Sequence, residues 1–288
     1  MQANGIEIAY ETFGDPDASP MVMVMGLGTQ MIAWPDELCE DLANAGYWVI
    51  RYDNRDVGGS THLTGVRAPA TAAVASRRSK PPYTIGDMGR DLLGLMDALQ
   101  IETAHVVGAS MGGYIAQAAA LQAPERVRSM TLIMTSTGSR LVGRVDLRLI
   151  PRLLTRRAIT DREGAGAAAV ETFRTIGSPG FEFDEEWYRE VGRRSYDRGH
   201  DPGGYRRQLA ACVAQPNRTA RLRELDIPSL VVHGLADPLV AATGGRALAK
   251  ALKGSRFLGI PGMGHDLPRA LWPTITEGIV ELAKRADG

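Results

Sequence analysis

Short apolar runs alternate along this chain with longer stretches in which apolar residues recur every three or four positions. Several of the short runs show no alternation of polar and apolar residues, which is typical of strands buried on both faces of a parallel sheet. The longer stretches then serve as crossover helices, so the pattern predicts an α/β fold with a mostly parallel sheet and flanking helices. The strands are expected at residues 6–10, 21–25, 47–52, 105–107, 129–134, 229–233 and 256–260.

Local signals mark the ends of the predicted helices. Thr84 and Asp87 form a capping-box-like start, Gly46 supplies a C-terminal stop, and Pro124 closes an Ala-rich helix. The helices are expected at residues 34–47, 84–99, 111–122 and 273–286. The irregular stretch 62–82 predicts a mobile surface loop.

Residues 138–217 interrupt this alternation. They include an amphipathic stretch at 141–154 but no clear buried strand, and they contain 14 Arg, no Lys and seven aromatic residues. We interpret this segment as a helical cap inserted into one α/β core, whose first part is 1–137 and whose second part is 218–288. An extra helical layer without a role in binding is the alternative.

Composition narrows the classes of function. The 288 residues fit one large α/β domain. The 33 basic and 33 acidic side chains give no net charge, so no nucleic-acid partner is expected. Cys39 and Cys212 are too few for a disulfide framework or a four-cysteine zinc site. The chain shows no secretion signal, and its longest N-terminal aliphatic run is far shorter than the ~20 residues of a membrane span. We expect a soluble, reduced, cytoplasmic protein, with export by a non-standard route and homo-oligomer formation left open.

The clearest chemical signal is Gly108-Ala109-Ser110-Met111-Gly112, which fits the G-x-S-x-G nucleophile elbow. A β-branched strand precedes it and an Ala-rich helix follows, as that turn requires. A serine on a tight strand-to-helix turn takes strained backbone angles, and side chains two residues before and after it would collide with neighbouring elements. Glycine at both positions removes those side chains. A glycine-rich packing turn is the alternative interpretation.

A serine nucleophile needs a base, and the base needs an orienting acid. Of the five histidines, His265 lies in a Gly/Pro-rich loop just after the last predicted strand, at the carboxyl end of the sheet where ligands bind. His105 and His233 fall inside predicted strands. His62 and His200 fall in polar sequence, where a solvated side chain is the usual case. His265 is therefore the predicted base.

The same rule selects the acid. Asp237 follows the predicted strand 229–233 at its carboxyl end, whereas Asp226 precedes that strand. Asp266 adjoins the base and would point away from it. An Asx-type turn residue is the alternative role of Asp237. The predicted catalytic residues, in chain order, are Ser110, Asp237 and His265.

Two backbone N–H groups are candidates for the oxyanion hole. Met25-Gly26-Leu27-Gly28 follows a predicted strand at the point where a loop normally supplies one donor. We assign that donor to Leu27, and the other to Met111 at the start of the helix after the serine.

Several segments together resemble the α/β-hydrolase superfamily along the whole chain: MGLG after a strand, RYDNRDVGGS at 51–60, GASMGG, HGLADP and IPGMGHDLP. Met-Gly in place of the commoner His-Gly, together with the RYD-x-RD turn, is similar to aclacinomycin methylesterase-like hydrolases, which cleave a methyl ester from a polyketide. The resemblance implies an eight-stranded, mostly parallel sheet, a helical cap, and neither a metal nor an organic cofactor. It also implies catalytic roles for Ser110, Asp237 and His265, and oxyanion donors at Leu27 and Met111.

Fold alone does not set function. The sequence predicts a serine hydrolase that acts on a small-molecule carboxylic ester of small to medium size, including a methyl ester. The same catalytic residues serve C–C bond hydrolases, cofactor-free perhydrolases and lactonases, and a non-catalytic ligand receptor is the alternative of another class. The resemblance also implies that the turn with Asp53, Arg55 and Asp56 braces the sheet edge and lies outside the site. The aromatic residues expected to contact the substrate are Phe181, Phe183, Trp187, Tyr188 and Tyr196.

Overall fold

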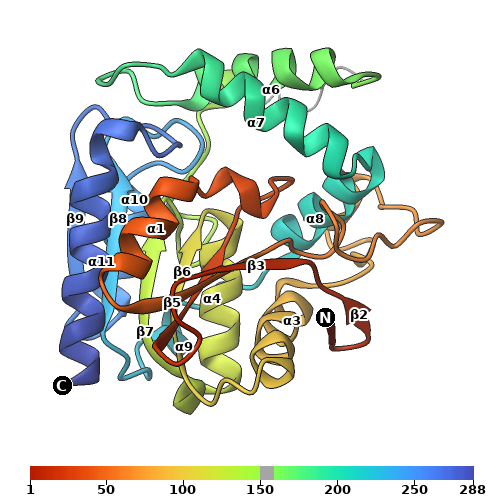
Figure 1. Ribbon diagram of the computed structural model, residues 1–288. Helices are drawn as coiled ribbons and strands as arrows, with labels where there is room; N and C mark the ends of the chain where they lie inside the picture. The colour runs from red at the N-terminus through yellow and green to blue at the C-terminus, as the bar shows by residue number, and fades with distance from the viewer. Residues whose placement is uncertain (150–158) are drawn as a thin grey trace.

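Figure 1 shows the fold as a computed structural model, which describes residues 1–149 and 159–288. The central sheet contains β3 (Tyr10–Phe13), β4 (Ser19–Val24), β5 (Tyr47–Tyr52), β6 (Ala104–Ala109), β7 (Val127–Ile133), β8 (Ser229–Gly234) and β9 (Arg256–Ile260). These strands lie in the order β3-β5-β4-β6-β7-β8-β9, and β3 is antiparallel to β5 while the other neighbours are parallel. The predicted mostly parallel sheet is confirmed.

The helices of the described residues are α1 (Asp36–Asn44), α2 (Thr71–Ala75), α3 (Ile85–Ala98), α4 (Met111–Gln122), α6 (Arg162–Ile176), α7 (Glu185–Arg198), α8 (Pro202–Ala214), α9 (Thr219–Leu222), α10 (Thr243–Ala251) and α11 (Trp272–Asp287). Short 3₁₀ turns occupy Met31–Ala33, Pro124–Arg126, Leu147–Leu149 and Arg269–Leu271. Thr84 and Asp87 form the predicted capping box at the start of α3. None of these helices is long and apolar enough to cross a membrane.

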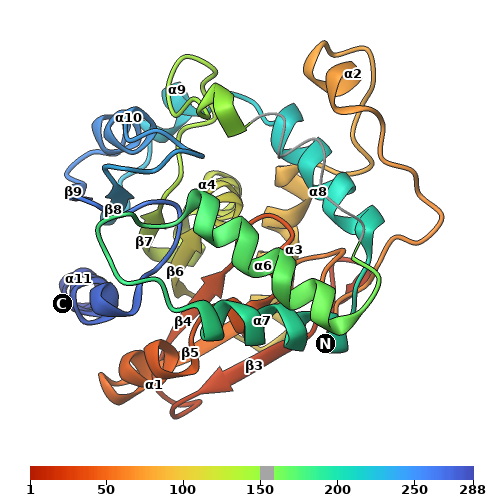
Figure 2. The same cartoon turned by 90° about the horizontal axis from the view of Figure 1, so that it is seen from above.

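Both faces of the sheet are covered by helices. The helices α1 and α11 pack on one face, and α3, α4 and α10 pack on the other (Figures 1 and 2). In β4, Met21 and Met23 belong to the hydrophobic cluster on the face of α1 and α11, and Val22 and Val24 to the cluster on the opposite face. All four side chains are at most 1% exposed. The absence of polar alternation in this strand therefore follows from burial on both sides.

The N-terminal strands differ from the expectation. The main sheet of the described residues has seven strands rather than eight. The predicted strand 6–10 is split, because β1 (Gln2–Ala3) and β2 (Ile6–Glu7) form a separate hairpin. Asn4 and Gly5 take positive φ values of 48° and 76°, which makes the tight turn. The chain then bonds to the loop after β5, with Glu7 N donating to Thr61 Oγ1 at 2.8 Å, instead of adding an eighth strand.

Helices α6 and α7 lie side by side over the edge at which the parallel strands end (Figures 1 and 2). Their connection runs beside the loop after β9. Gly180 N donates to Gly262 O at 3.0 Å, and His265 N donates to Ile176 O at 2.8 Å. The loop that carries the predicted base is therefore bonded to this helical layer through its backbone.

Helix α8 packs against α2. The latter lies in the stretch 62–82, which the sequence predicts to be an irregular loop, and its Ala-rich sequence gives one short helix there. The amphipathic stretch 141–154 lies partly outside the described residues. The division of the chain into 1–137, 138–217 and 218–288 stays a prediction.

Candidate active site

Ser110 lies on the turn between β6 and α4 with φ 55° and ψ −115°, a conformation that residues other than glycine rarely adopt. The neighbouring glycines explain how the turn fits. A Cβ on Gly108 would lie 2.4 Å from Gly112 O, and one on Gly112 would lie 2.0 Å from Val24 O. The Ser110 N–H donates to Ile133 O at 2.9 Å, which fixes the turn to β7. This is the strained strand-to-helix turn that the motif predicts.

The three predicted catalytic side chains come from separate segments and lie in one hydrogen-bonded line. Ser110 Oγ is 3.0 Å from His265 Nε2, and His265 Nδ1 is 2.7 Å from Asp237 Oδ2. Because an ionised carboxylate can only accept, Nδ1 carries the proton and donates to Asp237. Nε2 then accepts from the serine hydroxyl. His265 and Asp237 are each 6% exposed, whereas Ser110 is half-buried.

The Asp237 carboxylate is held on both oxygens. Its Oδ1 accepts from the N–H groups of Leu239 and Val240, both at 2.8 Å, which leaves Oδ2 for His265. A second histidine, His233, is fully buried with Nε2 3.7 Å from Asp237 Oδ2. Burial lowers the pKa of His233, and its Nε2–H donates to Val240 O at 2.7 Å. His233 is therefore neutral at physiological pH and does not neutralise the carboxylate that orients His265.

The two predicted oxyanion donors lie on segments that adjoin the serine. Met111 is the first residue of α4, so its N–H has no partner within the helix. Leu27 is the second residue of a turn in which Thr29 N donates to Gly26 O at 3.3 Å, and such a turn does not use the N–H of its second residue. A Cβ on Gly26 would lie 3.2 Å from Ser110 Cβ, so the turn passes directly beside the serine.

Two buried amide side chains hold this loop, and neither was predicted to have this role. Asn54 Nδ2 donates to Met25 O at 2.9 Å. Gly28 N donates to Gln208 Oε1, and Gln208 Nε2 donates to Arg55 O, both at 2.7 Å. The bonded partners lie far from these amides in the sequence, so no local pattern identifies them.

The side chain of Asp266 points into the helical layer. Its carboxylate accepts from the hydroxyl of Ser178 and from that of Tyr188, the latter at 2.9 Å. Burial raises the pKa of Asp266, and the two hydroxyls offset only part of that rise. Asp266, the residue after the predicted base, therefore ties the loop of His265 to α7 and to the α6–α7 connection.

The five aromatic residues predicted to contact the substrate lie on α7 or just before it. Tyr188 is buried and stacks on Phe183, with 5.0 Å between ring centroids. Phe181 and Trp187 are half-buried and pack against the hydrophobic cluster under α1 and α11. Tyr196 donates its hydroxyl to a backbone carbonyl of the same helical layer at 3.0 Å. Their contact with a substrate stays a prediction.

The acidic residues of RYDNRD bind arginines of the helical layer. Asp53 accepts from Arg198 at 2.7 Å, and Asp56 accepts from Arg207 at 2.7 and 2.9 Å. Burial raises the pKa of Asp56, but hydrogen bonds from Arg207, Tyr83 and a backbone N–H together bring it below its usual range. These contacts join the turn to α7 and α8, and its bracing of the sheet edge stays a prediction.

One cluster in the described part of the chain has the composition of a metal site. Ligand atoms of Asp56, His62 and Asp201 lie within 4.8 Å of one another. Arg207 donates to both carboxylates, at 2.7 Å to Asp56 and 2.5 Å to Asp201. The guanidinium therefore already supplies the positive charge that a cation would supply.

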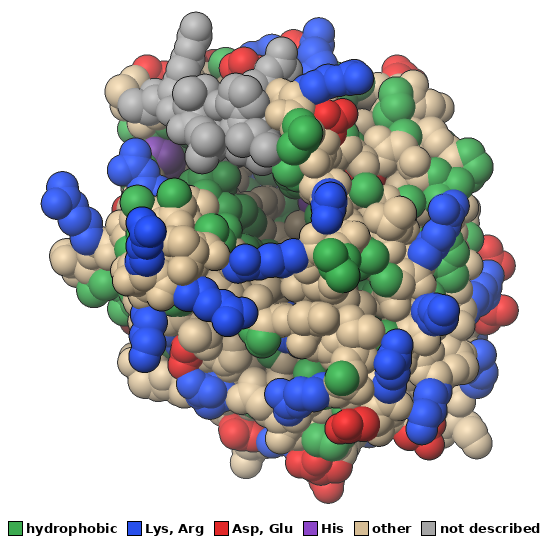
Figure 3. All heavy atoms as spheres, turned by 180° about the vertical axis from the view of Figure 1, so that it is seen from behind, with side chains coloured by type: hydrophobic (Ala, Val, Ile, Leu, Met, Phe, Trp, Pro, Cys, Tyr) green, Lys and Arg blue, Asp and Glu red, His purple; other side chains and the backbone are tan. Residues whose placement is uncertain are grey.

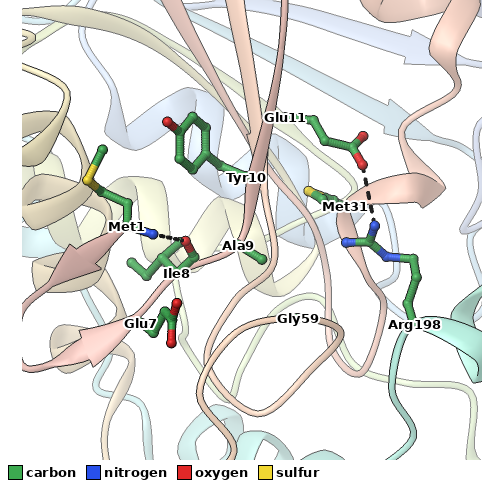
Figure 4. A pocket seen from close by; sticks show the side chains of 9 residues that line it. All are labelled: Met1, Glu7, Ile8, Ala9, Tyr10, Glu11, Met31, Gly59 and Arg198. Carbon is green, nitrogen blue, oxygen red and sulfur yellow. Dashed lines mark hydrogen bonds and ion pairs between the residues drawn. The ribbon is translucent and has the colours of Figure 1, made fainter.

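Two hollows in the surface of the described residues differ in character. On the face opposite that of Figure 1, hydrophobic side chains lie in a hollow with Lys and Arg around it (Figure 3). Figure 4 shows an open pocket between β2, β3 and the end of α7, where Glu11 and Arg198 form an ion pair at 3.3 Å and the Met1 amine donates to Ile8 O at 2.9 Å. None of the three predicted catalytic residues lines the pocket of Figure 4.

Comparison with known proteins identifies relatives over most of the chain. The family model for the α/β-hydrolase fold matches residues 19–268. Rhodomycin D methylesterase DauP of Streptomyces sp. strain C5 is 30% identical, with 93% of this chain and 92% of that protein covered. 3-Oxoadipate enol-lactonase 2 of Acinetobacter baylyi is 26% identical, with 87% and 83% covered. The crystal structure of the enol-lactonase from Burkholderia xenovorans LB400 has a TM-score of 0.76 at 25% identity and covers 98% of both chains.

Proposed function

Because the chain belongs to the α/β-hydrolase family, we propose that it is a serine hydrolase that cleaves a carboxylic ester through an acyl-enzyme. The observation that carries the proposal is the continuous hydrogen-bonded line from Ser110 Oγ through the His265 ring to Asp237, at 3.0 and 2.7 Å. Nucleophile, base and orienting acid are the parts that acyl transfer requires.

In the first half-reaction, Ser110 Oγ attacks the ester carbonyl while His265 Nε2 takes the hydroxyl proton. The tetrahedral intermediate carries its negative charge on the former carbonyl oxygen, within reach of the N–H groups of Leu27 and Met111. His265 then returns the proton to the leaving alcohol, and the C–O bond breaks to give the acyl-enzyme. Asp237 stabilises the imidazolium that forms between these steps.

Water completes the cycle by the same route. His265 takes a proton from a water molecule, which attacks the acyl carbonyl. The bond from the acyl carbon to Ser110 Oγ then breaks, the acid is released, and His265 returns the proton to Ser110 Oγ. Every proton moves between Ser110, the substrate, water and His265. These reaction steps need no redox partner.

We propose a methyl ester as the substrate class. The support is the similarity to rhodomycin D methylesterase DauP, at 30% identity over nearly the whole length of both proteins. The Met-Gly oxyanion loop and the RYD-x-RD turn are in line with it. A methyl ester releases the smallest alcohol, so the acid part of the substrate decides how the pocket is filled.

An enol lactone is a second candidate substrate. Enol-lactonases are similar to this chain both by sequence, at 26% identity, and by structure, with a TM-score of 0.76. A lactone is a cyclic ester, so the same steps open it and leave the alcohol attached to the acid. Turnover of matched methyl esters and enol lactones decides between the two, and a diketone substrate tests the C–C bond hydrolase alternative.

The first prediction is that turnover passes through Ser110. Ser110→Ala and His265→Ala should each lose most of the activity on p-nitrophenyl and methyl esters, and the double variant should lose little more, because the residues act as a unit. Intact-mass spectrometry after fluorophosphonate treatment should show one adduct, on Ser110.

The control is Ser76→Ala, which removes an exposed serine at the end of α2 and should keep full activity and labelling. An adduct on another residue, or near-native turnover by Ser110→Ala, contradicts the proposed mechanism. Ligand binding without any turnover across the substrate panel would favour the receptor alternative.

A further inference from the structure

Gln208 is a fully buried amide that bridges two loops of the core from helix α8. Its Oε1 accepts from Gly28 N, and its Nε2 donates to Arg55 O, both at 2.7 Å. Both ends of the side chain are therefore occupied. A buried amide with two short hydrogen bonds fixes the position of the groups that it contacts, because breaking either bond would leave a buried polar group without a partner.

The bonded N–H lies next to the predicted oxyanion donor. Gly28 directly follows Leu27 and takes φ 65°, as the third residue of the turn Gly26–Thr29. On the other side of the same turn, Asn54 Nδ2 holds Met25 O at 2.9 Å. A Cβ on Gly28 would lie 2.5 Å from the ring of Tyr205, so α8 also covers the turn by direct packing. The turn is therefore held on one side by Asn54, from the loop after β5, and on the other side by helix α8.

We infer that Gln208 is a positioning residue for the oxyanion hole, and this inference rests on the proposed function. The hydrogen bond to Gly28 N fixes the peptide unit between Leu27 and Gly28. Within the tight turn this also sets the orientation of the preceding peptide unit, between Gly26 and Leu27, which carries the N–H of Leu27. Such a donor is effective because it already points at the developing charge before the reaction begins. A turn free to rotate would have to be reoriented in each transition state, and kcat would fall.

Gln208 is separate from the contacts that dock α8. The helix is anchored to the core by Arg207, which binds Asp56 after β5, and by the packing against α2. Loss of the Gln208 amide should therefore leave α8 in place while it removes the hydrogen bond that fixes Gly28 N. This separation allows a test that distinguishes positioning from general stability.

The test is Gln208→Leu, which keeps the approximate volume and removes both hydrogen bonds. Full loss of one oxyanion donor lowers kcat by about 10²–10³-fold. A displaced donor should lower kcat on p-nitrophenyl acetate by about 10- to 100-fold, with KM within about twofold of the native value. The rate of fluorophosphonate labelling of Ser110 should fall in parallel. The pH midpoint of kcat/KM should not move, because the contacts of His265 and Asp237 are unchanged.

The matched control is Gln30→Leu. Gln30 is also a buried glutamine that joins the core to the helical layer, with Nε2 donating to Ser195 O at 2.7 Å and to Gly199 O at 2.9 Å. Its side-chain hydrogen bonds go to Ser195 O, Gly199 O and the Arg198 guanidinium rather than to the turn Gly26–Thr29. The control should lower Tm as Gln208→Leu does but keep kcat within about twofold.

Two outcomes overturn the inference: native kcat and labelling rate in Gln208→Leu, or equal losses of kcat in both variants. If Gln208→Leu does not fold, Gln208→Asn replaces it, since that side chain is polar but one methylene too short to reach both partners, and the same loss of kcat is expected. The proposed function fails in a different way, namely if the native protein shows no Ser110-dependent turnover or labelling.

Discussion

At Ser110, one residue holds a strained backbone because its neighbours have no side chains. The clash distances of 2.4 and 2.0 Å for a Cβ on Gly108 or Gly112 leave no room for even a methyl group. Steric rules of this kind act over a few residues, so the five-residue motif was enough to predict the strained turn and the place of Ser110 on it. The partners of Gln208 and Asp266 could not be predicted in this way. Their hydrogen bonds cross between segments far apart in the chain, and a lone Gln or Asp carries no signal of its partner.

At Asp56, the hydrogen-bonded carboxylate predicts a pH-dependent loss of stability. Asp56 is 1% and Arg207 is 4% exposed. Asp56→Asn removes the charge opposite this buried guanidinium, and breaking a buried pair typically costs about 3–5 kcal/mol. Arg207 keeps Asp201 as a partner, so we expect about 3 kcal/mol of lost unfolding free energy at pH 7.

The sign of the pH effect follows from the lowered pKa of Asp56 in the folded state. The unfolded chain binds a proton near pH 3.8, so the stabilising contribution is present above that pH and is lost as the pH falls through the folded pKa. Urea unfolding should give a higher free energy of unfolding for the native protein than for Asp56→Asn at pH 7, and this difference should shrink below about pH 4. Asp17→Asn, at an exposed acid, should change stability little at either pH. A difference that stays constant with pH would mean that the carboxylate charge is not its source.

At the scale of elements, the α6–α7 layer is built around stacked rings and bonded to the loop of the predicted base. The Tyr188 ring lies between Phe173, at 4.4 Å, and Phe183, at 5.0 Å, and its hydroxyl reaches Asp266. The sequence indicated that aromatic residues gather in this segment. It did not indicate which of them stack on one another and which pack over the core. Stacking between helices is set by helix packing, which no local pattern encodes.

This arrangement predicts two different effects of removing aromatic side chains from the α6–α7 layer. Trp187→Ala and Phe181→Ala, at half-buried positions over the core cluster, should change kcat/KM for a bulky or aromatic ester by ~10-fold or more, since a buried aromatic contact is worth about 1–3 kcal/mol. A small acetate ester should be nearly unaffected. Tyr188→Ala should instead lower Tm and both activities together, because it breaks the stack. Equal losses on both esters in every variant would assign the aromatics to folding alone.

At the scale of the whole molecule, the helical layer and the core are joined by buried charges. Asp53 and Asp56 lie three residues apart after β5. They bind Arg198, the last residue of α7, and Arg207, in the middle of α8. The order of the main elements followed from the apolar pattern. The apolar pattern also indicated seven strands, as the main sheet has, although the first of them begins at Tyr10 rather than at residue 6. The eighth strand that the family resemblance implied is absent from the described residues, because the N-terminal residues satisfy their backbone groups in a hairpin and a loop instead of the sheet.

The same charges predict that turnover is independent of metal ions. The acidic cluster of Asp56, His62 and Asp201 has suitable ligand atoms, but Arg207 holds both carboxylates at 2.7 and 2.5 Å. A divalent cation would have to displace the guanidinium and leave it buried without its partners, which is unfavourable. Activity on a p-nitrophenyl ester should therefore be the same in EDTA as in buffer, and added Mg²⁺, Mn²⁺ or Zn²⁺ should not raise it. A reproducible loss on chelation that one metal restores would show that the cluster, or another site, binds a required ion.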